Sequence, residues 1–158
     1  MSDELRIQKE PTEVNILTVG GEFLSGFVFV QPYHPLRVGR EQPADIVNSA
    51  DAYFPVETNE GIVLVAKAAI AEMDYVAEQA SDNVGTLPIG VSVSLSVTMS
   101  GGKSYEGAIA VEGPVNTPRL LDFMNRMAAS HTLFLELIED GRVRLLNRTH
   151  IETIRTID

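Results

Sequence analysis

Several residues of this chain have side chains that could carry chemistry. The segment Gly101-Gly-Lys-Ser104 ends like a phosphate-binding P-loop, in which backbone amides and a lysine surround a triphosphate. That motif needs a glycine five residues before the Gly-Lys pair, where Val97 stands, and a strand that runs into a helix. Because the segment is predicted to be strand, turn and strand, we interpret it as a hairpin turn.

The titratable residues give weaker indications of catalysis. His34, His131 and His150 could in principle bind a metal or act as a general base. No two of them are four residues apart, so ordinary surface or partly buried histidines are favoured. Asp45 and Asp122 could form a carboxylate pair if they faced each other, but hydrogen bonds to neighbouring backbone groups are the favoured interpretation. We expect no catalytic residue, no metal site and no cofactor.

Three arginines form the strongest candidate for a ligand or partner patch. Arg142 and Arg144 are two residues apart on a predicted strand and therefore share one face, and Arg148 follows closely. Such a patch could hold a phosphate, a carboxylate or an acidic partner surface. The structural alternative is a solvated strand face balanced by Glu136 and Glu139 on the neighbouring strand, and this alternative is favoured.

Composition limits the class of protein. With 44% hydrophobic and 22% charged residues among 158, the chain is expected to fold, and its lack of cysteine excludes disulfides and thiolate chemistry. The formal charge is −10, with 13 acids and 5 bases in residues 1–80 and 9 acids and 7 bases in residues 81–158. This acidity disfavours nucleic acid. No apolar stretch of membrane-spanning length and no secretion signal are evident, so we expect a cytoplasmic protein.

The elements that must position these residues occur in the same order twice. The first set comprises strands at 14–19 and 23–30 joined at a Gly-Gly pair, a short helix at 43–50, and strands at 53–58, 62–66 and 69–76. The second set comprises strands at 91–99 and 104–112, a helix opened by Thr117-Pro118, and strands at 132–138, 143–146 and 151–157. On the second helix, Leu120, Leu121, Met124 and Met127 are predicted to share one side.

Matching residues indicate that the chain carries an internal repeat. Gly21-Glu-Phe-Leu-Ser-Gly26 recurs as Gly102-Lys-Ser-Tyr-Glu-Gly107, and Asp45-Ile-Val-Asn48 recurs as Asp122-Phe-Met-Asn125. Phe54, Gly61 and Ile70 are matched with Phe134, Gly141 and Ile151. We predict a first unit at residues 1–76, a linker at 77–90 and a second unit at 91–158. Gly26, inside a strand, predicts a sharp bend or a bulge.

The order of elements in each unit resembles the Sm-like family of small β-barrels. The residues that carry the resemblance are Gly102 and Gly107, the Asp122-x-x-Asn125 element, and Arg148-Thr-His-Ile151, with Asp45 and Asn48 as the first-unit counterparts. The resemblance implies a mainly β protein of two tandem five-stranded SH3-like barrels. Each barrel would hold a short helix between its second and third strands.

The function expected from these observations is that of a non-enzymatic scaffold or adaptor. Units of 60 to 70 residues bury only about 60% of their unfolded surface, so they need a neighbour. We therefore expect protein partners or self-association into an oligomer through sheet edges. The alternative, implied by the Sm-like resemblance, is binding of single-stranded RNA by the arginine-bearing second unit.

Overall fold

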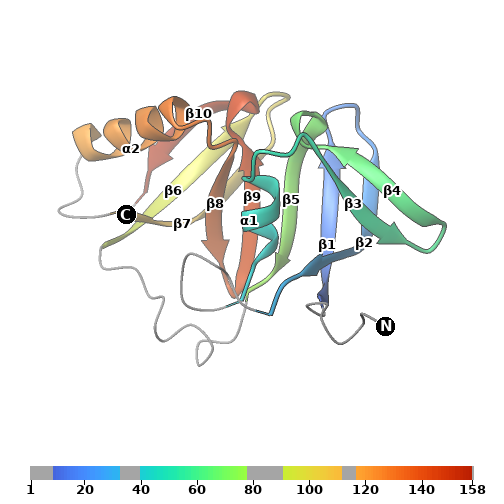
Figure 1. Ribbon diagram of the computed structural model, residues 1–158. Helices are drawn as coiled ribbons and strands as arrows, with labels where there is room; N and C mark the ends of the chain where they lie inside the picture. The colour runs from blue at the N-terminus through green and yellow to red at the C-terminus, as the bar shows by residue number, and fades with distance from the viewer. Residues whose placement is uncertain (1–8, 33–39, 78–90, 112–116, 158) are drawn as a thin grey trace.

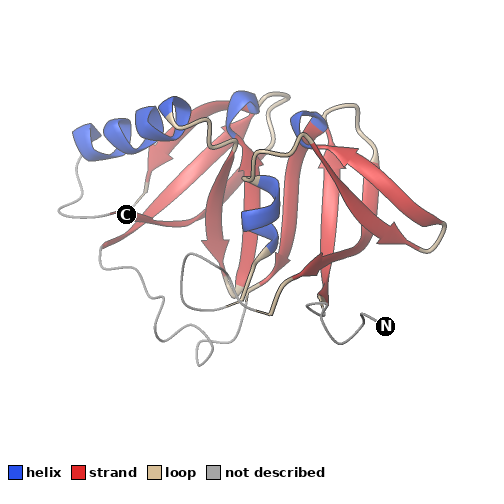
Figure 2. Ribbon diagram, viewed as in Figure 1, coloured by secondary structure: helices blue, strands red, loops and turns tan. Residues whose placement is uncertain are grey.

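The computed structural model describes residues 9–32, 40–77, 91–111 and 117–157, and within these ranges the chain is mainly β (Figures 1 and 2). The elements of the first half are β1 (Glu10–Thr18), β2 (Phe23–Val30), α1 (Pro43–Val47), β3 (Tyr53–Thr58), β4 (Gly61–Ala66), the 3-10 turn η2 (Lys67–Ala69) and β5 (Ile70–Val76). Those of the second half are β6 (Val91–Met99), β7 (Ser104–Val111), α2 (Thr117–Ala129), β8 (Phe134–Glu139), β9 (Arg142–Asn147), η4 (Arg148–His150) and β10 (Ile151–Thr156).

All ten described strands belong to one antiparallel sheet. Its order is β10-β6-β7-β8-β9-β5-β1-β2-β3-β4, so each half arranges its strands as fifth, first, second, third and fourth. The halves join where β9 pairs with β5, and the sheet ends at β10 and β4 (Figure 1). The expectation of two separate closed barrels therefore differs from the structure, in which the ladder continues across both halves as an open sheet.

The hairpins predicted from glycine turns are confirmed. β1 pairs with β2 across the turn that contains Gly21, and β6 pairs with β7 across Gly101 and Gly102. These three glycines have φ values of 92°, 98° and 94°, a region that side chains with a Cβ rarely adopt. The structural interpretation of Gly101-Gly-Lys-Ser104 as a turn between strands is correct. The predicted linker falls largely on residues 78–90, which lie outside the described residues.

Equivalent pairings in the two halves lie 81 residues apart. Phe27 is opposite Glu57 in the first half and Ala108 is opposite Ile138 in the second, and the hairpins close at Thr58–Gly61 and Glu139–Arg142. The sequence matches of Phe54 with Phe134 and of Gly61 with Gly141, at 80 residues, are thus one residue out of step. In the strand register, the counterpart of Phe134 is Tyr53.

Gly26 and Gly107 serve a purpose different from the predicted bulge. The β1–β2 register runs without a break through Gly26. A Cβ on Gly26 would lie 2.4 Å from the carbonyl oxygen of Glu57, and one on Gly107 would lie 2.9 Å from that of Ile138. The glycines are needed because β3 and β8 cross β2 and β7 at close range.

The sheet encloses two clusters of buried apolar side chains. The cluster of the second half includes Val97, Leu135 and Leu137. The cluster of the first half includes Val14, Ile16 and Val28, and it also contains three residues of the second half: Phe134, Val143 and Leu145. The first core is therefore completed by β8 and β9, across the junction between the halves.

The two helices differ in length and in packing. α1 contacts both β2 and β8, so it spans the two halves, whereas α2 contacts β7 (Figure 1). Leu120, Met124 and Met127 of α2 face the second core, as predicted. The placement of Leu121 on that side is wrong, since Leu121 is exposed and Phe123 packs there instead. Neither described helix has the length and apolarity needed to cross a membrane.

Candidate protein–protein interface

The junction between β9 and β5 shows how one half of this chain recognises the other. The strands pair antiparallel, with Leu145 opposite Met73 and Val143 opposite Tyr75. All four side chains are buried and belong to the first core. The junction therefore combines a backbone ladder with an apolar layer beneath it, as within a single sheet.

A polar cluster covers the other face of the junction. The Tyr105 hydroxyl donates to the carboxylate of Glu72, and Arg144 Nη1 lies 3.5 Å and Lys103 Nζ 3.9 Å from Glu72 Oε1. The guanidinium of Arg144 also stacks 4.3 Å from the centre of the Tyr105 ring. Burial, together with the hydrogen bond to Glu72, raises the pKa of Tyr105. A carboxylate of the first half is thus satisfied by side chains of the second.

The candidate arginine patch is largely part of this junction. Arg142 pairs with Asp74 of β5, and Arg144 pairs with Glu72. The solvated-face interpretation expected Glu136 and Glu139 of β8 as the counter-charges, whereas these two ion pairs reach across to the other half. Arg148 lies apart from them, with its Nε donating to the carbonyl of Thr132 at 3.0 Å.

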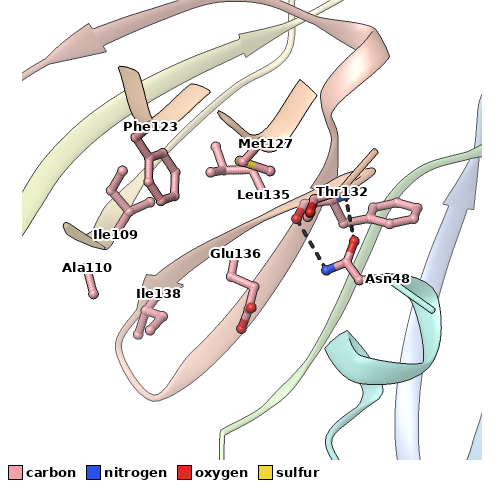
Figure 3. Close-up of a pocket in the computed structure, with 10 residues that line it drawn as sticks. Asn48, Ile109, Ala110, Phe123, Met127, Thr132, Leu135, Glu136 and Ile138 are labelled. Atoms are coloured by element: carbon pink, nitrogen blue, oxygen red, sulfur yellow. Dashed lines mark hydrogen bonds between the residues drawn. The ribbon is translucent and has the colours of Figure 1, made fainter. Parts of the chain in front are cut away.

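Asn48 provides a second link between the halves. Its Oδ1 accepts from the Phe134 amide at 2.9 Å, and its Nδ2 donates to the Phe134 carbonyl at 3.5 Å (Figure 3). Asn48 thereby extends the hydrogen bonding of β8 in the way a neighbouring strand would. The same side chain lies at one end of a hollow of about 500 Å³ lined by Phe123, Met127 and Ile138 (Figure 3).

The other positions of the Asp-x-x-Asn element are not brought together. Asp45 accepts from the Gln42 amide at 2.7 Å at the start of α1, which confirms the backbone-capping interpretation for this residue. Asp122 and Asn125 are exposed on α2. Asn48 ends a five-residue helix, whereas Asn125 lies inside a 13-residue helix, so the two asparagines occupy different environments.

The histidines do not assemble a metal site in the described part of the chain. His131 lies after α2 in a left-handed conformation with φ of 60°, His150 lies in η4, and His34 is outside the described residues. No group of three or more His, Asp or Glu side chains suitable for a metal occurs among residues 9–32, 40–77, 91–111 and 117–157.

Lys67 stands at the position that η4 fills with Arg148, and it is buried. Its ammonium donates to the hydroxyl of Ser49 at 2.7 Å and to the Ser49 carbonyl at 3.2 Å. Burial lowers the pKa of Lys67, while nearby Asp51 acts in the opposite direction. These contacts tie the segment after α1 to the turn before β5, which is a structural role.

The free edge of the sheet at β4 is the counterpart of the covered edge at β9. In the 81-residue register, the residues of the second half that complete the first core have three apolar counterparts in the first half. Phe134, Val143 and Leu145 are 1%, 7% and 0% exposed, whereas their counterparts Tyr53, Ile62 and Leu64 are 62%, 70% and 69% exposed. The side chains that form an interface at β9 are thus present at β4 without a described strand beside them.

Sequence reasoning placed this strand but missed its exposure. The run Ile62-Val-Leu-Val-Ala66 predicts a strand with little access to water. A usable signal was its contrast with Arg142-Val-Arg-Leu-Leu-Asn147: only the strand of the second half carries the charges that pair with β5.

Comparison of the chain with family models, with curated proteins and with solved structures finds no match.

Proposed function

We propose that this chain is a non-enzymatic scaffold that assembles with protein partners through the β4 edge of its sheet. A single observation carries the proposal. Tyr53, Ile62 and Leu64 are strongly exposed at one end of the sheet, while the side chains in the equivalent places of the second half are buried against β5.

The backbone of β4 supports the same function. Edge strands are usually protected by charges, prolines or bulges, because their free amides and carbonyls otherwise pair with another strand. β4 has the sequence Gly-Ile-Val-Leu-Val-Ala, which contains no charged residue and no proline. Its register with β3 is regular from Tyr53–Ala66 to Thr58–Gly61. Such an edge is suited to strand addition, in which a partner supplies the next strand.

The Sm-like resemblance remains part of this proposal. The shared strand order of the two halves, the glycines that permit β2–β3 and β7–β8 crossings, and the helix between the second and third strands support it. On this view the chain consists of two small β units that interact through sheet edges rather than through a catalytic pocket.

Light scattering coupled to size exclusion tests the proposal. Wild-type protein at tens of micromolar should have a mass above the 17.2 kDa of one chain. Leu64→Lys should lower that mass toward 17.2 kDa, because it places a charge in the apolar layer. Leu121→Lys, at an exposed leucine of α2, is the matched control and should assemble like wild type. A mass of one chain at every concentration contradicts assembly by self-association.

A further inference from the structure

We infer that the strand bound by β4 is β10 of a second copy of the chain, paired in the register that β5 uses on β9. This inference rests on the proposed assembly function and gives it a partner. The internal junction supplies the template, because it already joins a fourth strand of one half to a fifth strand of the other. The strands left at the ends of the sheet are again a fourth and a fifth strand.

The β10 edge lacks the covering that β5 receives. Ile70 and Met73 of β5 are fully buried, whereas their counterparts Ile151 and Ile154 are only partly buried against the second core. The first core is completed by three side chains from a neighbouring half, while the described residues of the second core all belong to its own half. Tyr53, Ile62 and Leu64 of another copy are the residues that would complete the second core.

The register follows from the internal junction. Met73 lies opposite Leu145 and Asp74 opposite Arg144, so a shift of 81 residues places Ile154 opposite Leu64 and Arg155 opposite Val63. This pairing puts Ile154 and Leu64 on the core side of the sheet. A slip by one residue would move these apolar side chains to the other face, which makes the register specific.

The charged cluster of the internal junction is replaced as a set at the free edges. Glu72, Arg144 and Tyr105 correspond to Thr153, Val63 and Leu24. Because the acid and its basic partner are absent together, the pairing of β10 with β4 would leave neither charge buried alone. Arg155 is exposed on the face away from the core, where its charge stays in water.

Pairing of β4 with β4 of a second copy is the competing arrangement. It would cover Ile62 and Leu64 but would leave β10 and the second core as they are. The β4–β10 arrangement covers both ends of the sheet with one kind of contact. Such a head-to-tail contact generates either a ring or a filament, whereas a symmetric β4–β4 contact stops at a dimer.

Engineered cysteines can distinguish these arrangements, because the chain contains no cysteine of its own. The Ala77 amide donates to the Gly141 carbonyl at 2.7 Å, so the Asp74–Arg144 pair falls between hydrogen-bonded pairs, where side chains are closest. Its counterpart is Arg155 opposite Val63. Val63→Cys and Arg155→Cys are therefore made in separate chains, both at exposed positions.

The two variants are oxidised alone and as an equimolar mixture, after circular dichroism has confirmed that each is folded. We expect a disulfide-linked dimer in the mixture and in neither variant alone, since positions 63 and 155 would meet only between chains. The mixture of Val63→Cys with Thr153→Cys, which is two residues out of register, is the control and should cross-link less.

Each other outcome overturns the inference in a distinguishable way. Cross-linking of Val63→Cys with itself would establish β4–β4 pairing, so the assembly function would stand and the β10 partner would fall. An assembly seen by light scattering without any Val63–Arg155 cross-link would do the same. Absence of cross-links together with a single-chain mass would overturn both the partner and the assembly function.

Discussion

Tyr105 of β7 donates its hydroxyl to the carboxylate of Glu72 on β5, so a buried hydrogen bond joins the second half of the chain to the first. The guanidinium of Arg144 contacts both members of the pair. The junction between the halves is therefore specified by polar groups as well as by its apolar layer.

The Tyr105 contact predicts a change of stability at alkaline pH. The pKa of Tyr105 is raised in the folded protein above its ordinary value of 10.0. The unfolded chain therefore loses this proton at lower pH, so the stability from the contact is complete below about pH 10 and is lost as the pH rises beyond it. Urea unfolding between pH 8 and pH 11 should show a steeper decline for wild type than for Tyr105→Phe.

At neutral pH, Tyr105→Phe should lower the free energy of unfolding by about 1.5 to 3 kcal/mol, as expected for a hydrogen bond to a charged group. Equal pH profiles for the two proteins would contradict a titrating role for Tyr105.

The replacement of the polar cluster at the free edges predicts non-additive mutations. Glu72→Thr alone should cost on the order of 3 kcal/mol, because it leaves Arg144 without its buried counter-charge. Glu72→Thr combined with Arg144→Val and Tyr105→Leu, the residues found at positions 153, 63 and 24, should recover most of that loss. Urea denaturation of the single and triple variants measures the coupling. A triple variant as unstable as the sum of its single changes would argue against the equivalence of the junctions.

The two asparagines of the Asp-x-x-Asn element should respond differently to truncation. Asn48→Ala removes both hydrogen bonds to the Phe134 backbone and should cost about 1 to 3 kcal/mol. Asn125→Ala, on the exposed surface of α2, should not destabilise the protein, since alanine is the better helix former. Thermal unfolding of both variants provides the measurement, and equal losses would mean that Asn125 has a structural role of its own.

The close crossing of β2 by β3 predicts that Gly26 cannot be enlarged. Gly26→Ala would bring a methyl group within 2.4 Å of a carbonyl oxygen and should cost about 1 to 3 kcal/mol. Gly20→Ala is the control, because its Cβ would meet nothing nearer than 3.9 Å and its expected change is below about 1 kcal/mol. If both variants unfold at the same denaturant concentration, the crossing is more tolerant than these distances indicate.

RNA binding, the alternative implied by the Sm-like resemblance, is expected to be absent. Arg142 and Arg144 already pair with carboxylates, and the chain has a formal charge of −10. Electrophoretic shift assays with mixed single-stranded oligonucleotides at low salt should show no complex. A shift that weakens steeply with added salt, and that Arg148→Ala reduces, would support RNA binding instead.

Local patterns in the sequence predicted most strands because they are determined by local properties. The alternation in Val91-Ser-Val-Ser-Leu-Ser-Val97 and the glycine turns at 20–21 and 101–102 lead to strands within a few residues of the observed bounds. The core side of α2 was mostly predicted as well. Leu121 was misplaced because it lies about 100° around the helix from Leu120.

The interface could not be predicted because it depends on which half covers which. Matching residues by type paired Phe134 with Phe54, but Phe134 belongs to the core of the other half. A one-residue difference in register changes the face of a strand, and residue types alone do not reveal it. Similarly, the apolar character of Ile62 and Leu64 does not show that no described strand lies beyond them. That information exists only in the strand order.

The contribution of Phe134, Val143 and Leu145 to the first core has a consequence during synthesis on the ribosome. Residues 9–77 leave the exit tunnel well before residue 145, so the leading half waits with its core incomplete until the trailing half arrives. A nascent chain stalled shortly after residue 90 should therefore be more sensitive to protease than one stalled after β9 has emerged.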